Sequence, residues 1–93
     1  MAATHTPTNN PTKITVTGTS DNTIDLSKIL QGNEVMIEWV SGTTVQFNTM
    51  GVIVADSAAI NSTQTKLILK VQRDQYVYCK GGDGSETFNL TAL

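Results

Sequence analysis

EVMIEWV, residues 34–40, places a large apolar side chain at every second position, at Val35, Ile37 and Trp39. A strand places successive side chains on opposite faces, so this stretch predicts a β-strand with one face turned to a core. Its two expected faces are Val35, Ile37 and Trp39 on the apolar side and Glu34, Met36 and Glu38 on the other. Trp39 shares the parity of the apolar side, and we therefore interpret it as a core residue and not as a ligand-stacking platform.

The same period of two recurs along most of the chain. It is found in KITVT (13–17), TIDLSKIL (23–30), TTVQFNTM (43–50), KLILKV (66–71), QYVYCK (75–80) and SETFNLT (85–91). Ser41-Gly42 predicts a tight hairpin turn, Arg73-Asp74 a second turn, GVIV (51–54) a run apolar on both faces, and residues 55–65 a loop. Two points stay open: Ile29-Leu30 suits a strand or one helical turn, and either Tyr76/Tyr78 or Val77/Cys79 could face the core.

Composition favours the same architecture. Fifteen of the 93 residues are Thr, and Ser, Thr and Asn together make up 28, a mixture of β-branched and turn-forming side chains. We expect an all-β fold, a small antiparallel β-sandwich or jelly-roll-like barrel of about seven to eight short strands. Residues 13–93 should form this single domain. Residues 1–12, polar and punctuated by Pro7 and Pro11, should form a flexible N-terminal arm.

Size and charge exclude several classes of function. A 93-residue chain can bury one core but leaves little material for a deep cleft. The net charge of −2 is spread without basic clusters, so we expect no nucleic-acid or membrane partner. Cys79 is the single cysteine and cannot form an internal disulfide, and the N-terminus has no apolar signal-peptide core. These features favour assembly in a reducing cytoplasm.

The loop KGGDGSE, residues 80–86, invites chemical interpretations that the sequence does not support. It leads into a strand and not into a helix, as a phosphate-binding loop would, and it lacks the ligand spacing of a calcium loop. One Cys and one His cannot hold zinc, and Lys80 alone is weak support for a reactive Cys79 thiol. We predict a plain hairpin turn, with Cys79 as a small apolar filler, and no metal or cofactor.

No catalytic constellation is recognisable. His5, the single histidine, lies in the predicted arm, away from any nucleophile. Glu34 and Glu38 are four residues apart on one strand, which separates them by about 13 Å, too far for a glycosidase pair. We therefore expect a protein that is not an enzyme.

The pattern over residues 33–81 resembles the small β modules of tailed-bacteriophage virions, such as head-decoration, head-fibre and tail-fibre modules. The resemblance is carried by Val45 and Phe47, by Leu67 to Val71, by Arg73-Asp74 and by Tyr76 to Gly81. Such modules dock onto a virion or form trimers without catalysis. The resemblance thus implies a virion protein, assembled in the host cytoplasm, whose partner is the major capsid protein or another virion component, and a homotrimer.

Our functional expectation is a capsid decoration protein that binds the outer capsid surface through its arm and its sheet edges. The expected contact residues are Thr4, Thr6, Thr8, Asn9, Asn10, Thr12, Tyr76 and Tyr78. Deleting residues 1–12 should then abolish particle binding and leave the melting temperature nearly unchanged. The alternative is a fibre module that binds carbohydrate or a receptor through Tyr76 and Tyr78 with Gln46 and Asn48. An inhibitor of a host factor is a further alternative.

Overall fold

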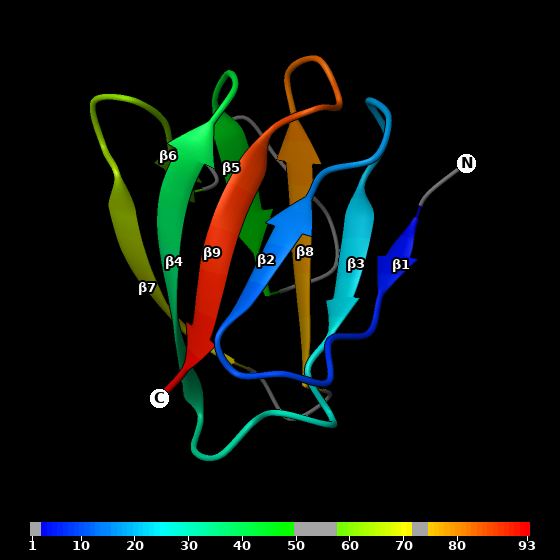
Figure 1. Ribbon diagram of the computed structural model, residues 1–93, viewed down its shortest axis with the longest axis vertical. Helices are drawn as coiled ribbons and strands as arrows, with labels where there is room; N and C mark the ends of the chain where they lie inside the picture. Colours follow the sequence, from blue (N-terminus) through cyan, green and yellow to red (C-terminus); the bar gives the residue numbers. More distant parts are fainter. Residues whose placement is uncertain (1–2, 50–57, 72–74) are drawn as a thin grey trace.

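The computed structural model describes residues 3–49, 58–71 and 75–93. These residues form nine β-strands and no helix (Figure 1). The strands are β1 (Thr4–His5), β2 (Thr12–Thr15), β3 (Asn22–Asp25), β4 (Glu34–Ser41), β5 (Val45–Asn48), β6 (Ala58–Ile60), β7 (Lys66–Lys70), β8 (Tyr76–Gly81) and β9 (Thr87–Ala92). Within these ranges, nothing helical is long and apolar enough to cross a membrane.

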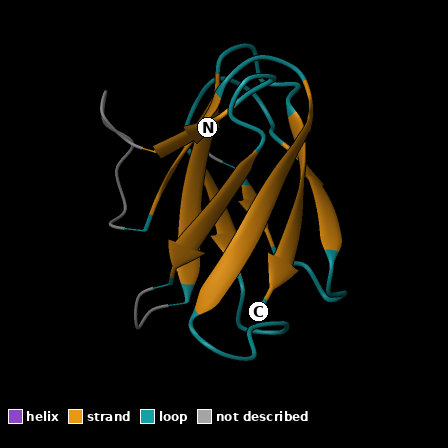
Figure 2. Ribbon diagram, turned by 90° about the vertical axis from the view of Figure 1, so that its left-hand side faces the viewer, coloured by secondary structure: helices purple, strands orange, loops and turns teal. Residues whose placement is uncertain are grey.

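The strands form two sheets that pack face to face (Figure 2). Sheet A has the order β1-β3-β8-β5-β6, and sheet B has the order β2-β9-β4-β7. All described pairings are antiparallel except that of β1 with β3, which is parallel. The expected all-β sandwich is therefore confirmed.

The strand order is that of a jelly roll. β2 pairs with β9, β3 with β8, β4 with β7 and β5 with β6, as in one long antiparallel hairpin whose two arms run side by side. Successive pairs lie alternately in sheet B and sheet A, so the hairpin is rolled up on itself. The pairings of β4 with β9 and of β5 with β8 then join the pairs into sheets. β1 adds one outer strand to sheet A.

The core lies between the sheets and follows the alternation in the sequence. Val35 and Ile37 of β4 are buried, whereas Glu34 on the same strand is exposed. The rings of Phe47 in sheet A and Phe88 in sheet B meet edge to face, with centroids 5.0 Å apart. The core residues are Ile14, Val16, Ile24, Leu26, Ile29, Val35, Ile37, Val45, Phe47, Ile60, Val71, Val77, Cys79, Phe88, Leu90 and Ala92.

Two predicted hairpins are wrong. The Ser41-Gly42 turn joins β4 in sheet B to β5 in sheet A, and the loop after Gly81 joins β8 in sheet A to β9 in sheet B. Among the described strands, β5 and β6 form the one pair of chain neighbours that hydrogen-bond to each other. A rolled hairpin sends neighbouring strands to opposite sheets, and the side-chain alternation is the same in either case. The period of two therefore could not distinguish the two connections.

The two points that the sequence left open are resolved. On β8, Val77 and Cys79 face the core, while Tyr76 and Tyr78 face outward. Ile29-Leu30 belongs to a single turn and not to a strand, because the amides of Ile29 and Leu30 donate to the carbonyl of Leu26 at 3.0 and 2.9 Å.

The predicted loop at 55–65 contains β6, whose Ile60 is buried. The GVIV run at 51–54 and the Arg73-Asp74 turn lie outside the described residues.

Candidate functional site

The N-terminal segment is attached to the sandwich from Ala3 onward. β1 pairs with β3, and the amide of Thr23 donates to the carbonyl of Ala3 at 2.8 Å. His5 lies level with Ile24, and its Nε2 is 2.8 Å from Oδ1 of Asn22. The side chains of Thr4, Thr6 and Thr8 remain exposed, and so does that of Asn9.

The segment then crosses from sheet A to sheet B. Asn10 hydrogen-bonds to Ala92 through both ends of its amide, donating at 3.1 Å and accepting at 2.8 Å. Thr12, half-buried, pairs with Leu90 at the start of β2. β1 and β2 are the outer strands of their sheets on the same side of the molecule (Figure 1). The segment therefore covers one open side of the sandwich and contributes one strand and the first residue of another.

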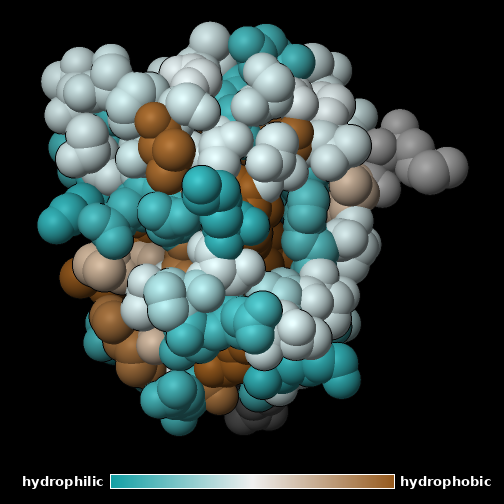
Figure 3. Space-filling model, viewed as in Figure 1, coloured by the Kyte–Doolittle hydropathy of each residue, from teal (hydrophilic) through white to brown (hydrophobic). Residues whose placement is uncertain are grey.

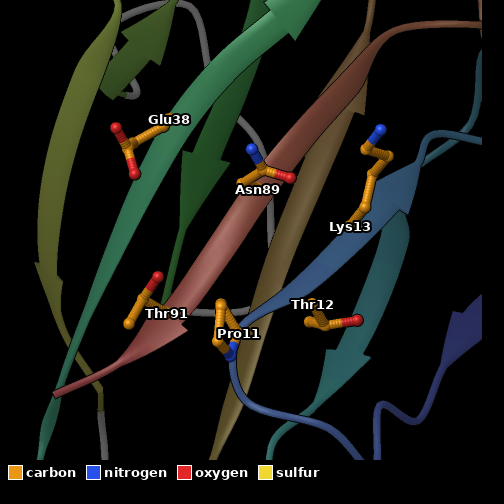
Figure 4. Close-up of a pocket in the computed structure, with 6 residues that line it drawn as sticks. All are labelled: Pro11, Thr12, Lys13, Glu38, Asn89 and Thr91. Atoms are coloured by element: carbon orange, nitrogen blue, oxygen red, sulfur yellow. The ribbon is translucent and has the colours of Figure 1, made fainter.

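Two hollows flank β2. The first, between β1 and β2, is lined by His5, Thr6, Pro7, Thr12, Lys13, Ile14 and Thr15. The second, on the outer face of sheet B, has a volume of about 350 Å³ and is lined by Pro11, Thr12, Lys13, Glu38, Asn89 and Thr91 (Figure 4). Asn89 lies level with Lys13 on one side and Glu38 on the other. Hydroxyl, amide and opposite charges here suit hydrogen bonding to another polar surface.

The outer face of sheet A brings the two tyrosines together. Their rings lie 6.3 Å apart between centroids, at 64° to each other. Tyr78 is level with Thr23 on β3 and Asn48 on β5. Thr4 is level with Thr23, so the predicted contact residues Thr4 and Tyr78 belong to one row across sheet A.

The neighbouring rows are also polar. Tyr76, 37 % exposed, is level with Asp25, and Lys80 is level with Gln46. Hydrogen bonds from Ser27 lower the pKa of the Asp25 carboxyl, which is therefore charged at neutral pH. We call this outer face of sheet A the tyrosine face; its main side chains are Tyr76, Tyr78, Gln46 and Asn48.

Sequence reasoning missed Glu86, the buried acidic residue that fixes the loops at one end of the sandwich. Its Oε2 accepts from Oγ1 of Thr43 and from the amides of Gly82 at 2.6 Å and Asp83 at 2.9 Å. Its Oε1 accepts from the amide of Gly84 at 3.1 Å. Burial by itself raises the pKa of this carboxyl, but the hydrogen bonds outweigh burial and lower the pKa from 4.5 to about 2.

Glycines make room for this carboxylate. A Cβ at Gly81 would overlap the carboxylate itself, and one at Gly42 would lie 2.7 Å from the Cα of Glu86. The glycines of the KGGDGSE loop therefore enclose a buried anion, which a plain hairpin turn does not need. A sequence signal existed: Glu86 has the parity of Phe88 and Leu90, which are apolar and buried.

Asn22 is the second buried polar side chain among the described residues. Its Nδ2 donates to the carbonyls of Thr17 at 2.9 Å and Ser20 at 3.1 Å, and its Oδ1 accepts from the amide of Thr17 at 3.0 Å. Because Oδ1 is an acceptor, Nε2 of His5 must carry the proton in their shared bond. Asn22 shares its parity with Ile24 and Leu26, so the same signal marked it.

The side chains that were weighed for reactive chemistry or ligand stacking are Cys79, Glu34, Glu38 and Trp39, and their surroundings in the fold are as follows. Cys79 is fully buried, and burial, aided by the charges of Asp21 and Glu86, raises its thiol pKa from 9.0 to about 12. Glu34 and Glu38 point outward from β4, level with Lys70 and Lys66. Trp39 packs half-buried against the core, and its indole N–H has no hydrogen-bond partner within the described ranges. Across those ranges, acidic, His and Cys side chains form no group that could hold a metal.

Comparison of the chain with family models, with curated proteins and with solved structures gave no match. Three surfaces of the protein bear on its function: the edge covered by residues 4–12, the outer face of sheet B, and the tyrosine face.

Proposed function

We propose that this protein is a non-enzymatic accessory virion protein that binds the outer surface of a phage capsid. The observation that carries the proposal is the N-terminal segment, which lies along the open side of a jelly roll with Thr4, Thr6 and Thr8 exposed. β1 is the outermost strand of sheet A, so its outer edge offers a place where a neighbouring strand can add. The resemblance of residues 33–81 to phage virion modules points the same way.

The mechanism follows from the geometry of such a contact. Strand addition supplies backbone hydrogen bonds that do not depend on deep pockets, and the exposed threonines add hydroxyl contacts around them. Each contact is modest by itself. Many copies on one particle, each bridging capsid subunits, would together oppose expansion of the capsid through multivalency.

Deleting residues 1–12 is not a clean test of this proposal. The deletion would remove the hydrogen bonds of Asn10 to Ala92 and of His5 to Asn22, so the earlier expectation of an unchanged melting temperature no longer holds. A better variant keeps the backbone and alters only exposed side chains: Thr4→Glu, Thr6→Glu and Thr8→Glu together. The matched control is Ser62→Glu, Thr63→Glu and Thr65→Glu, exposed residues between β6 and β7.

Co-sedimentation with intact particles of the phage that encodes the protein measures the result. The wild type and the control should sediment with particles, and the N-terminal variant should remain in the supernatant with an unchanged circular-dichroism melting curve. Equal binding by the N-terminal variant would refute the role of this edge. Absence of binding by the wild type would refute the virion proposal as a whole.

A second candidate function, a carbohydrate-binding fibre module, is favoured by the tyrosine face. Tyr76 and Tyr78 lie side by side and outward, with Asn48 level with Tyr78. Aromatic rings beside amide side chains are the chemistry that binds sugars by stacking and hydrogen bonding. A glycan array probed with the wild type and with Tyr76→Ala tests this candidate. A blank array for the wild type would exclude it.

A further inference from the structure

The outer face of sheet B carries an ordered pattern of charge on its two adjacent strands β4 and β7. Three cross-strand rows are in register: Glu34 with Lys70, Met36 with Ile68, and Glu38 with Lys66. β4 therefore presents an acidic, an apolar and an acidic side chain in succession, and β7 presents a basic, an apolar and a basic one. We call these six residues the charge ladder.

The apolar middle row is open to solvent. Ile68 is 57 % exposed, and Met36 beside it is half-buried. Leu93, 48 % exposed, follows β9 next to Glu34, whose carbonyl accepts from its amide at 3.0 Å. Figure 3 shows apolar surface on this side of the molecule, over the lower part of β4 and β7. An exposed apolar centre within a charged rim is the usual composition of a protein–protein contact.

The charges of the ladder are available to a partner. Glu38 and Lys66 approach within 3.8 Å of each other, but their side chains are 36 % and 67 % exposed. An ion pair this open to water contributes little to the stability of its own chain, so either group can pair with a second molecule at small cost.

The pattern is complementary to itself under a two-fold rotation. We place a second copy with the outer face of its sheet B against that of the first copy. The two copies are related by a two-fold axis that lies between these two outer faces, runs parallel to the strands, and passes midway between β4 and β7. β4 of each copy then lies over β7 of the other, and the rows stay level. Glu34 faces Lys70 of the second copy, Met36 faces Ile68, and Glu38 faces Lys66. Every acidic group meets a basic group, and the apolar rows meet each other.

We propose that the charge ladder is a homodimer interface in which two copies pack face to face through sheet B. Edge-to-edge pairing of β7 centred on Ile68 is disfavoured by the same pattern, because antiparallel pairing in this register would set Lys66 against Lys70. The occupant is a second copy because the ladder supplies both halves of the complementarity in matching order. The inference is independent of virion binding, and it replaces the trimer expected from the resemblance with a two-fold dimer.

A charge exchange tests the geometry. The fourfold variant Glu34→Lys, Glu38→Lys, Lys66→Glu, Lys70→Glu keeps the net charge and the cross-strand pairs within each chain. It remains complementary to itself but sets like charges against the wild type. Sedimentation equilibrium should therefore find dimers of the wild type and dimers of the fourfold variant. Mixing tagged wild type with untagged fourfold variant should give no mixed dimer on affinity capture.

The two half-exchanges give the opposite result. Glu34→Lys with Glu38→Lys, and Lys66→Glu with Lys70→Glu, should each be monomeric alone and should form a mixed dimer when combined. Lys28→Glu with Lys80→Glu, exposed residues away from the ladder, is the matched control for the second pair and should dimerise as the wild type does. A monomeric or trimeric wild type, or free mixing of wild type with the fourfold variant, would overturn the proposal. Should a half-exchange fail to fold, the fourfold variant still decides the question.

Discussion

Thr43 donates a hydrogen bond through its Oγ1 to the carboxylate of Glu86 and so joins the β4–β5 connection to the β8–β9 loop. The backbone of Glu86 extends the link, because its carbonyl accepts from the amide of Val16 at 2.8 Å. One residue thereby fastens three connections at the same end of the sandwich. These are the β2–β3, β4–β5 and β8–β9 connections, and each carries the chain from one sheet to the other. Glu86 therefore helps to hold the two sheets in place relative to each other.

We predict that Glu86→Gln destabilises the fold by about 3 kcal/mol, because an amide cannot accept at both positions and leaves buried donors unpaired. Chemical denaturation at neutral pH measures the change. Lys28→Gln, at an exposed charged side chain between β3 and β4 and away from the charge ladder, is the control and should alter stability by less than about 0.5 kcal/mol. Equal stability of the two variants would contradict the role given to Glu86.

The lowered pKa of Glu86 also predicts acid sensitivity. Its pKa is 4.5 when unperturbed and about 2 in the fold, so the folded state binds fewer protons between these values. The contribution of Glu86, on the order of 3 kcal/mol, is therefore complete above pH 4.5 and is lost as the pH falls towards 2. The free energy of unfolding of Glu86→Gln, followed over this range, should show a shallower decline than that of the wild type. Parallel curves would refute the assignment.

Glycine substitutions distinguish steric crowding from backbone conformation. Gly81→Ala should destabilise the protein by about 3 kcal/mol or more, because the added methyl overlaps the Glu86 carboxylate and displaces it from its donors. Gly18 has a φ of 68° but open space around its Cβ position. Gly18→Ala should therefore cost only about 1 kcal/mol, and Gly18→Asn less than that. The melting temperature should be lowest for Gly81→Ala, higher for Gly18→Ala and highest of the three for Gly18→Asn. A Gly81→Ala protein as stable as Gly18→Asn would contradict the close packing of Gly81 against the Glu86 carboxylate.

The alternation in the sequence was sufficient to predict the class of fold and the facing of most strands. Val35 and Ile37 on β4 are buried as expected, and Val45 and Phe47, the alternate apolar residues of β5, are buried as well. The alternation could not predict which strands pair, because a strand shows the same alternation whether it pairs with its chain neighbour or lies in the other sheet. The length of the Ser41-Gly42 and Gly81–Gly84 connections suggested hairpins, yet both cross between sheets.

Buried polar groups were missed for a different reason. Hydrophobic periodicity treats a polar side chain as a marker of the outer face, although Glu86 and Asn22 have the parity of the core. Their neighbours contain the glycine and hydroxyl residues that supply space and donors, such as Gly81 and Thr43. Of the predicted contact residues, Asn10 uses its side-chain amide to hydrogen-bond to the backbone of Ala92. Thr4 and Tyr78 lie in one row only because of the register of β1, β3 and β8, which the sequence does not reveal.

Asn22→Ala should destabilise the protein by about 2–3 kcal/mol, because it leaves the amide and carbonyl of Thr17 and the ring of His5 without their buried partner. Asn33→Ala, at an exposed side chain before β4, is the matched control and should have little effect. Hydrogen exchange offers a second measurement: the amide of Thr17 should lose protection selectively in Asn22→Ala. Unchanged exchange at Thr17 would show that this side chain does not hold the loop.

The thiol of Cys79 should report on opening of the whole sandwich. It is fully buried on β8, and its pKa is raised to about 12, so at pH 8 the native protein holds almost no thiolate. Labelling by an aromatic disulfide reagent should therefore be very slow in the native protein and immediate in denaturant.

Because Cys79 pairs with Asn22 on one side and Phe47 on the other, it cannot be exposed by fraying of an edge strand. Labelling rates should thus rise in Glu86→Gln in proportion to its loss of global stability. They should be insensitive to Ser62→Lys, at an exposed residue between β6 and β7. Rapid labelling of the folded wild type would show that this part of sheet A opens locally, contrary to the packing between the two sheets.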